Sequence, residues 1–156
     1  MAWLNDIRTG AKTAIAANGT FTTADIYKRE ELREEQWDRA LINVFMEAME
    51  PRTNRQPNGV VLKIFPIRFV VAWHVDGRSN APSATDTITE NKSTYNDALI
   101  TALATMKPGG AYTVSGVYDA AWASSNLSYK ETIEHEDIMG RDYRIAQTWE
   151  FHTYES

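Results

Sequence analysis

The sequence has 156 residues, of which 43% are apolar and 24% are charged. These proportions are typical of a globular protein, and the length fits a single domain over residues 1–156 with its own hydrophobic core. The chain contains no cysteine, which excludes disulfide bonds, thiolate zinc sites and cysteine nucleophiles.

The formal net charge is −5, so the chain has no overall attraction for nucleic-acid phosphates. No segment approaches the roughly 20 consecutive apolar residues that a membrane-spanning helix needs. Residues 1–6 also lack the basic and apolar segments of a signal peptide. We therefore expect no membrane partner, and a protein that stays where it is made unless it is built into a particle there.

Apolar residues at helical spacing predict two main helices. The first covers about Ala2–Ala17, and Asn18-Gly19 is predicted to end it in the left-handed conformation. The second covers Thr94–Met106, where Thr94 and Asp97 have the spacing of a capping box. A Pro-Gly-Gly sequence directly after the second helix is predicted to end it.

Alternation of apolar and polar residues predicts the strands. The strongest signal covers Val60–Val75, where Pro66 indicates a bulge or an edge because proline donates no ladder hydrogen bond. Residues 40–50 fit a helix or a strand, and their alternation favours the strand. Further extended segments are predicted over residues 21–28, 111–117, 127–137 and 143–154.

Short turns between successive strands favour an α+β fold, with a largely antiparallel sheet of about four to five strands and two main helices packed against it. We expect one core, to which the strands and the second helix contribute Phe69, Val71, Trp73, Leu99, Leu103, Ile145 and Trp149. Trp3 is also expected on a core face, whereas Trp37 and Trp122 lie in irregular segments and are candidates for a partner surface.

Three segments are predicted as exposed loops or turns, because they are polar and rich in turn-forming residues. They are Pro51–Gly59, Asp76–Glu90 and Ile138–Asp142. Their charged residues are our candidates for contacts with partner proteins: Arg52, Arg55, Arg78, Asp86, Arg141 and Asp142. The charged run over residues 29–39 is interpreted as an exposed, solvated face.

The sequence contains none of the common catalytic or nucleotide-binding motifs. It has no nucleophile elbow, phosphate-binding loop or dinucleotide fingerprint. The histidines, His74, His135 and His152, are far apart in the chain. His135 lies among acidic residues, but neighbours on a strand point to opposite faces, so His135 and Glu136 do not readily bind one ion. We therefore predict a protein that is not an enzyme, with no catalytic, cofactor-binding or metal-binding residues.

Three features of the chain occur together in a known family. An N-terminal amphipathic helix precedes an extended piece that ends in Ile26-Tyr27-Lys28. A strand pair, residues 41–46 and 69–75, then leads to a helix over Tyr95–Met106. The closing segment, Tyr143–Glu155, alternates aromatic and polar residues and ends in Tyr-Glu. In these features the chain resembles the tail terminator proteins of long-tailed bacteriophages, of the lambda type, from which it departs in its long loops.

The resemblance implies a structural function in the virion, with assembly in the host cytoplasm. A hexameric ring of such proteins caps the tail tube, ends polymerisation of the tube protein and offers the docking surface for the head connector. DNA passes through the lumen without specific binding, which an acidic subunit would suit because like charges repel phosphates. Two alternatives remain open: another neck or head–tail joining protein, or a small-ligand-binding or enzymatic α+β domain.

Overall fold

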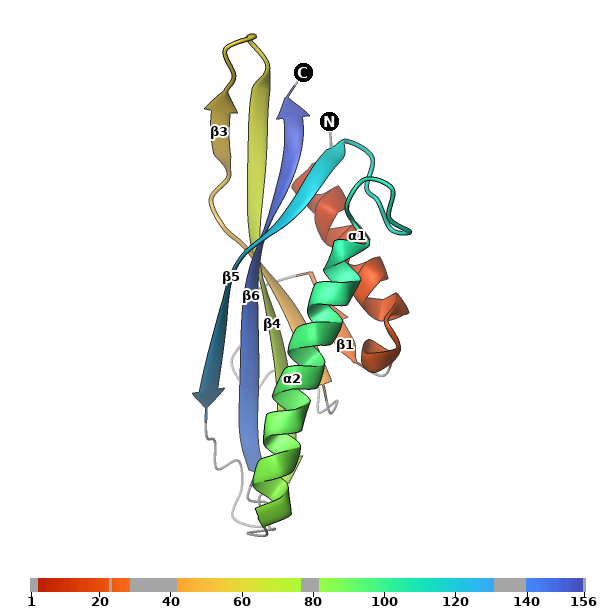
Figure 1. Cartoon of the computed structure of the whole chain (residues 1–156), viewed down its shortest axis with the longest axis vertical. Coiled ribbons are helices and arrows are strands. Elements are labelled where there is room, and N and C mark those ends of the chain that lie inside the picture. The colour runs from red at the N-terminus through yellow and green to blue at the C-terminus, as the bar shows by residue number, and fades with distance from the viewer. Residues whose placement is uncertain (1–2, 23, 29–41, 77–81, 131–139, 156) are drawn as a thin grey trace.

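The computed structural model describes residues 3–22, 24–28, 42–76, 82–130 and 140–155. The elements in chain order are α1 (Leu4–Ala17), the 3₁₀ turn η1 (Gly19–Phe21), β1 (Asp25–Tyr27), β2 (Ile42–Ala48), β3 (Arg52–Arg55), β4 (Val61–Asp76), α2 (Pro82–Ala104), β5 (Val117–Lys130) and β6 (Gly140–Glu155). The strands form one six-stranded sheet, and both helices lie on the same face of it (Figure 1). The predicted α+β class is confirmed, with one strand more than expected.

The sheet is organised around one long antiparallel ladder. β4 and β6 have 16 residues each and pair along their whole length, from Val61↔Glu155 to Asp76↔Gly140. β5 pairs with the free side of β6, and β2 and β3 share the other side of β4. β1 is the exception to the antiparallel order, because it pairs with β2 in parallel. One end of the sheet therefore has the strand order β3-β4-β6-β5, and the other end β1-β2-β4-β6-β5.

Pro66 lies where β2 gives way to β3 beside β4. The ladder of β2 ends at Ala48↔Ile67 and that of β3 begins at Arg52↔Ile64, so three residues face two across this break. The carbonyl of Pro66 accepts a hydrogen bond from the backbone nitrogen of Met49 at 3.0 Å. A strand residue turns its N–H and C=O to the same side, so the N–H that proline lacks falls at the break. Pro66 therefore lies at an interruption of the pairing, in agreement with the prediction of a bulge or an edge position.

One hydrophobic core fills the space between the helices and the sheet. All seven residues predicted for it are at most 2% exposed and belong to one cluster: Phe69, Val71, Trp73, Leu99, Leu103, Ile145 and Trp149. The inner face of α1 joins the same cluster through Ile7, Ala11, Ala14 and Ile15. Trp3, predicted on a core face, is instead 60% exposed, because it immediately precedes α1 and lies beyond the packed turns.

Gln147 is a fully buried polar residue on the helix-covered face of β6. Its side-chain amide donates to the backbone oxygen of Asn96 at 3.0 Å and to its side-chain oxygen at 2.7 Å. Its own oxygen accepts from the Trp149 indole nitrogen at 3.0 Å. Burying an amide is costly unless it is hydrogen-bonded, so these bonds fix where α2 crosses the sheet.

The largest error of the sequence prediction concerns α2. The helix begins at Pro82, inside the segment predicted as a loop over residues 76–90. Thr94 and Asp97 are therefore interior residues and do not form a cap. Proline is favoured at the first helical position, where its missing N–H would have no helical partner. The polar composition that suggested a loop does not prevent a helix whose later turns are anchored by Leu99 and Leu103.

Smaller errors concern the ends of elements. Residues 51–59, predicted as a turn or hairpin loop, do form a hairpin, and its turn places Gly59 at φ +82°. The strand β3 inside this segment was not predicted. Residues 111–116 form turns, and the strand predicted there starts only at Val117. Arg141 and Asp142, predicted in a turn, belong to β6 and pair with β4. Asn18 has φ −74°, so α1 does not end in the left-handed conformation; its side chain instead caps η1.

The strands predicted over residues 40–50, 60–75 and 143–154 are confirmed. β2 covers Ile42–Ala48, and Ile42, Val44 and Met46 enter the core as the alternation indicated. Asn43 and Phe45 on the opposite face are buried too. The predicted strand over residues 127–137 coincides with β5 up to Lys130, and its remainder lies outside the described residues.

Replacing Leu103 by alanine tests the packing of α2. Leu103 is completely buried, so the loss of burial together with the cavity should lower the free energy of unfolding by about 2–5 kcal/mol. Thr101, exposed on the same helix, is the control, and Thr101→Ala should change stability by less than about 0.5 kcal/mol. Urea denaturation measures both. Equal effects of the two substitutions would contradict the packing described here.

Candidate functional site

The β3–β4 hairpin projects at one end of the long axis of the molecule, and we call residues 52–64 the arm (Figure 1). All four residues of β3 are exposed, and they include Arg52 and Arg55. The turn at its tip is closed by a hydrogen bond from the Gln56 nitrogen to the Val60 oxygen at 2.8 Å. The arm thus carries two arginines to the far end of an acidic chain.

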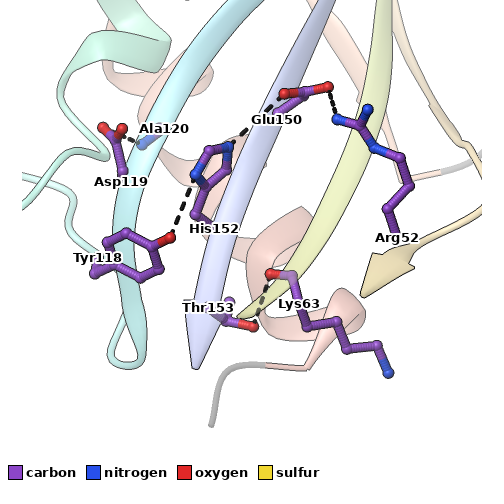
Figure 2. Close-up of polar contacts among 8 residues, drawn as sticks. All are labelled: Arg52, Lys63, Tyr118, Asp119, Ala120, Glu150, His152 and Thr153. Atoms are coloured by element: carbon purple, nitrogen blue, oxygen red, sulfur yellow. Dashed lines mark hydrogen bonds and ion pairs between the residues drawn. The ribbon is translucent and has the colours of Figure 1, made fainter. Parts of the chain in front are cut away.

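A row of polar side chains crosses the sheet at the base of the arm, on the face opposite the helices (Figure 2). The hydroxyl of Tyr118 on β5 lies 3.5 Å from His152 Nδ1 on β6. The other ring nitrogen, Nε2, lies 3.7 Å from Glu150 Oε2. Glu150 Oε1 forms an ion pair with Arg52 on β3. We call these four residues the polar row.

Strand alternation and one bulge place the polar row. Along β6, Trp149 and Phe151 point into the core, so Glu150 and His152 point to the opposite, outer face. On β5 the register shifts between Val117 and Asp119, so the extra residue, Tyr118, also reaches the outer face. Its ring stacks on that of Tyr154, with centroids 4.4 Å apart.

The surroundings of Tyr118 affect the protonation of its phenol. Burial raises the pKa of Tyr118, and the nearby Tyr154 and Asp119 raise it further, so this phenol remains protonated at neutral pH. The hydroxyl of Tyr118 and Nδ1 of His152 can share a hydrogen bond, and which of the two donates depends on the tautomer of the ring. Nε2 of His152 is buried and has no hydrogen-bond partner among the described residues, at 3.7 Å from Glu150 Oε2. The row ends in the guanidinium of Arg52, at the edge formed by β3.

An open groove of about 540 Å³ lies beside the row, at the break between β2 and β3. It is lined by Met49, Glu50, Pro51, Arg52, Pro66, Thr148 and Glu150. Pro51 and Pro66 both line the groove, which opens where the strand pairing beside β4 is interrupted. His152 and Tyr118 do not line the groove. The groove therefore offers carboxylates and a guanidinium for binding, but the imidazole is not directed at anything bound in it.

The residues predicted for partner contacts are divided between the two ends of the sheet. Arg52 and Arg55 lie together on the arm, and Trp122 lies on β5 with 51% of its surface exposed. Asp86 is in the first turns of α2. Arg141 and Asp142 are in β6, at the end of the β4–β6 ladder away from the arm, where they pair with Val75 and His74. Arg78 and Trp37 lie outside the described residues.

The sequence prediction missed the polar row. It placed His152 on the outer face of the last strand, as observed, and assigned it no role. The spacing of Glu150 and His152, two residues apart on one predicted face, was the available signal. The sequence contains no pattern that predicts the bulge that brings Tyr118 close to His152, because a bulge depends on how two strands pair.

Comparison with known proteins yields no match, either to a protein-family model or to a curated protein. Within the described part of the chain, neither helix is both long and apolar enough to cross a membrane.

Native mass spectrometry tests the prediction that the chain binds no metal. Among the described residues, no group of three histidine or acidic side chains is arranged to hold an ion. His135 and its acidic neighbours lie outside the described residues, and they are the sequence cluster to test. The chain is incubated with zinc, and the excess zinc is then removed by buffer exchange. We expect the measured mass to be that of the chain without metal. A stoichiometric adduct that disappears in His135→Ala would contradict this prediction.

A double-mutant cycle tests how strongly the row is held. The Arg52 side chain is 59% exposed, so solvent screens its ion pair with Glu150, and the coupling energy should be about 0.2–1 kcal/mol. The matched control is the pair of Arg68 and Glu47, 3.3 Å apart on the same face, which should give a similar value. A coupling above about 2 kcal/mol for Arg52 and Glu150 alone would mean that this pair is desolvated.

Proposed function

We propose that the chain is a structural protein of a tailed bacteriophage that forms a homohexameric ring on the tail tube. The ring ends tube polymerisation and provides the docking surface for the head connector. The protein would then be found in the neck of the virion, after assembly in the host cytoplasm. Its partners would be its own copies, the tube protein and the connector protein, and it would need no cofactor.

The arm is the observation that carries this proposal. A hairpin whose first strand is fully exposed, and which projects past the helices, contributes little to the core of its own chain (Figure 1). Such an extension is typical of a protein that must reach a neighbour. Arg52 and Arg55 give it a positive charge within a chain of net charge −5, and opposite charges steer association between protein surfaces.

The order of elements also supports the proposal. The resemblance to the tail terminators rests on an amphipathic helix, a short strand, a strand pair, a helix and a closing strand. The fold has these elements as α1, β1, β2 with β4, α2 and β6. The candidate contacts lie at both ends of the β4–β6 ladder, and a ring between tube and connector needs two different axial surfaces of this kind.

A neck or head–tail joining protein of another type remains the alternative within the same class. The alternative from a different class is a ligand-binding domain or an enzyme, and the groove beside Pro66 is the feature that favours it. Binding sites for small molecules are usually concave and place a few polar groups around one point. The groove is open, and the two members of the row that line it, Glu150 and Arg52, are already paired with each other.

Charge reversal at three predicted contact residues, Arg52 and Arg55 on the arm and Arg78 outside the described residues, tests the docking role. The combined variant Arg52→Glu, Arg55→Glu and Arg78→Glu should leave few tails joined to heads in electron micrographs, whereas each single substitution should be mild because exposed ion pairs contribute little individually. Joining by the wild-type chain should weaken as ionic strength rises. The control reverses Lys12 and Lys107, which are exposed on α1 and after α2, and should join tails normally.

Two outcomes would contradict the proposal. If the triple variant is folded and still gives joined tails of normal length, the arm is not the docking surface. If particles assembled without this chain have tubes of regulated length, the chain does not terminate tubes at all.

A further inference from the structure

Two strand edges are open at the arm end of the sheet. The strand order there is β3-β4-β6-β5, so β3 and β5 are the outermost strands among the described residues. An edge strand exposes backbone N–H and C=O groups along its free side, which can pair with another strand. β3 and β5 run in opposite directions, because each step of this order is antiparallel.

The side chains at these two edges offer one complementary pair on each face, and each pair belongs to a different register of an antiparallel contact. On the outer face, Arg52 stands at the β3 edge and Asp119, the ladder partner of His152, stands at the β5 edge (Figure 2). Arg52 has five N–H donors and shares only part of them with Glu150. The polar row therefore has a cation at one end and Asp119 beside its other end.

The helix-covered face has a second complementary pair. Arg55 faces Val61 and so lies on this face, and it forms no ion pair within the described part of the chain. Trp122 is the ladder partner of the buried Trp149, yet half of its own surface is exposed at the β5 edge. A guanidinium stacked on an indole gains cation–π attraction, so Arg55 and Trp122 would suit each other across a shared edge.

We infer that a second copy of this chain pairs its β3 with β5 of the first, which makes the sheet continuous between neighbouring copies. The inference rests on the proposed ring and names its subunit contact. Rotation about an axis parallel to the strands preserves their direction, so each β3 would meet its neighbour's β5 antiparallel. The two edges differ, and such a head-to-tail contact closes into a ring when the rotation divides the circle.

The edges are also limited in length, which restricts the pairing. β3 has four residues and lies between Pro51 and Pro57, which cannot donate ladder hydrogen bonds. On β5, the register shifts leave an unbroken stretch from Asp119 to Trp122. If the outer face continues from one copy to the next, Asn54 lies opposite either Asp119 or Ala121, depending on the register. The first register places Arg52 diagonal to Asp119, and the second places Arg55 diagonal to Trp122. Both positions can be tested directly.

The absence of cysteine from the chain makes disulfide cross-linking a clean test. Directly opposed residues of an antiparallel pair have Cβ atoms about 4.5–5.5 Å apart, close enough for a disulfide after small adjustments. Asn54→Cys is combined with Asp119→Cys in one variant and with Ala121→Cys in another. Under mild oxidation, one of these variants should give a covalent ladder that ends in a closed ring on non-reducing gels.

Controls separate the head-to-tail contact from other contacts. Each single-cysteine variant should remain uncross-linked, because the contact joins two different edges. Asn54→Cys combined with Thr101→Cys, an exposed position on α2, should also give no ladder. The native mass of the wild-type chain and of every variant is measured in parallel, so that a variant that does not fold or assemble is recognised.

The outcomes distinguish the contact from the function. A wild-type oligomer without cross-links in either pair would overturn the inferred contact and leave the proposed ring standing on another surface. Cross-linked dimers of Asn54→Cys alone would mean that two β3 edges meet symmetrically, which overturns the inferred contact and argues against a ring. A chain that is monomeric at all concentrations and within assembled particles would overturn both.

Discussion

The fold depends on the unbroken ladder between β4 and β6. Its sixteen residue pairs extend the ladder well beyond the part that the helices cover. The additional length forms one strand of the arm and positions the polar row. The same ladder fixes both faces at once, because side chains alternate along each strand. Trp149 and Phe151 complete the core, and the residues between and after them, Glu150 and His152, are necessarily directed outwards. A shift of register by one residue would exchange these roles.

The long ladder also explains why Pro66 is tolerated in a central strand. β4 must present its free side to two different strands, and the change from β2 to β3 leaves a short stretch without ladder bonds. Proline fits there without the loss of a hydrogen bond. The break separates a packed half of the sheet, covered by α1 and α2, from a half in which β3 is fully exposed. One end of these strands therefore belongs to the core beneath the helices, and the other end carries the arm.

The sequence was sufficient for the parts of the fold that repeat with a regular period. The faces of β4 and β6, the apolar face of α1 and the later turns of α2 were all predicted, because burial imposes a spacing of two or 3.6 on apolar residues. The start of α2 was not, since residues 82–93 are rich in polar types and contain no comparable apolar face. The polar row was not foreseen either. It joins residues 52, 118, 150 and 152, and which strands lie side by side cannot be read from local periodicity.

If neighbouring copies pair through β3 and β5, as we infer, the energetics of these edges favour a closed ring over an isolated pair of copies. Each ladder hydrogen bond contributes a net of about 0.5–1.5 kcal/mol, and an exposed ion pair contributes about 0–1 kcal/mol. A contact of three or four residues with one side-chain pair is therefore weak by itself, once the cost of association is subtracted. In a closed ring every subunit makes this contact twice, and the last contact forms within one assembly at high effective concentration. The short edges, the limiting prolines and the bulges of β5 are then consistent with one requirement: neighbours associate in one register and direction, and mainly when the ring can close.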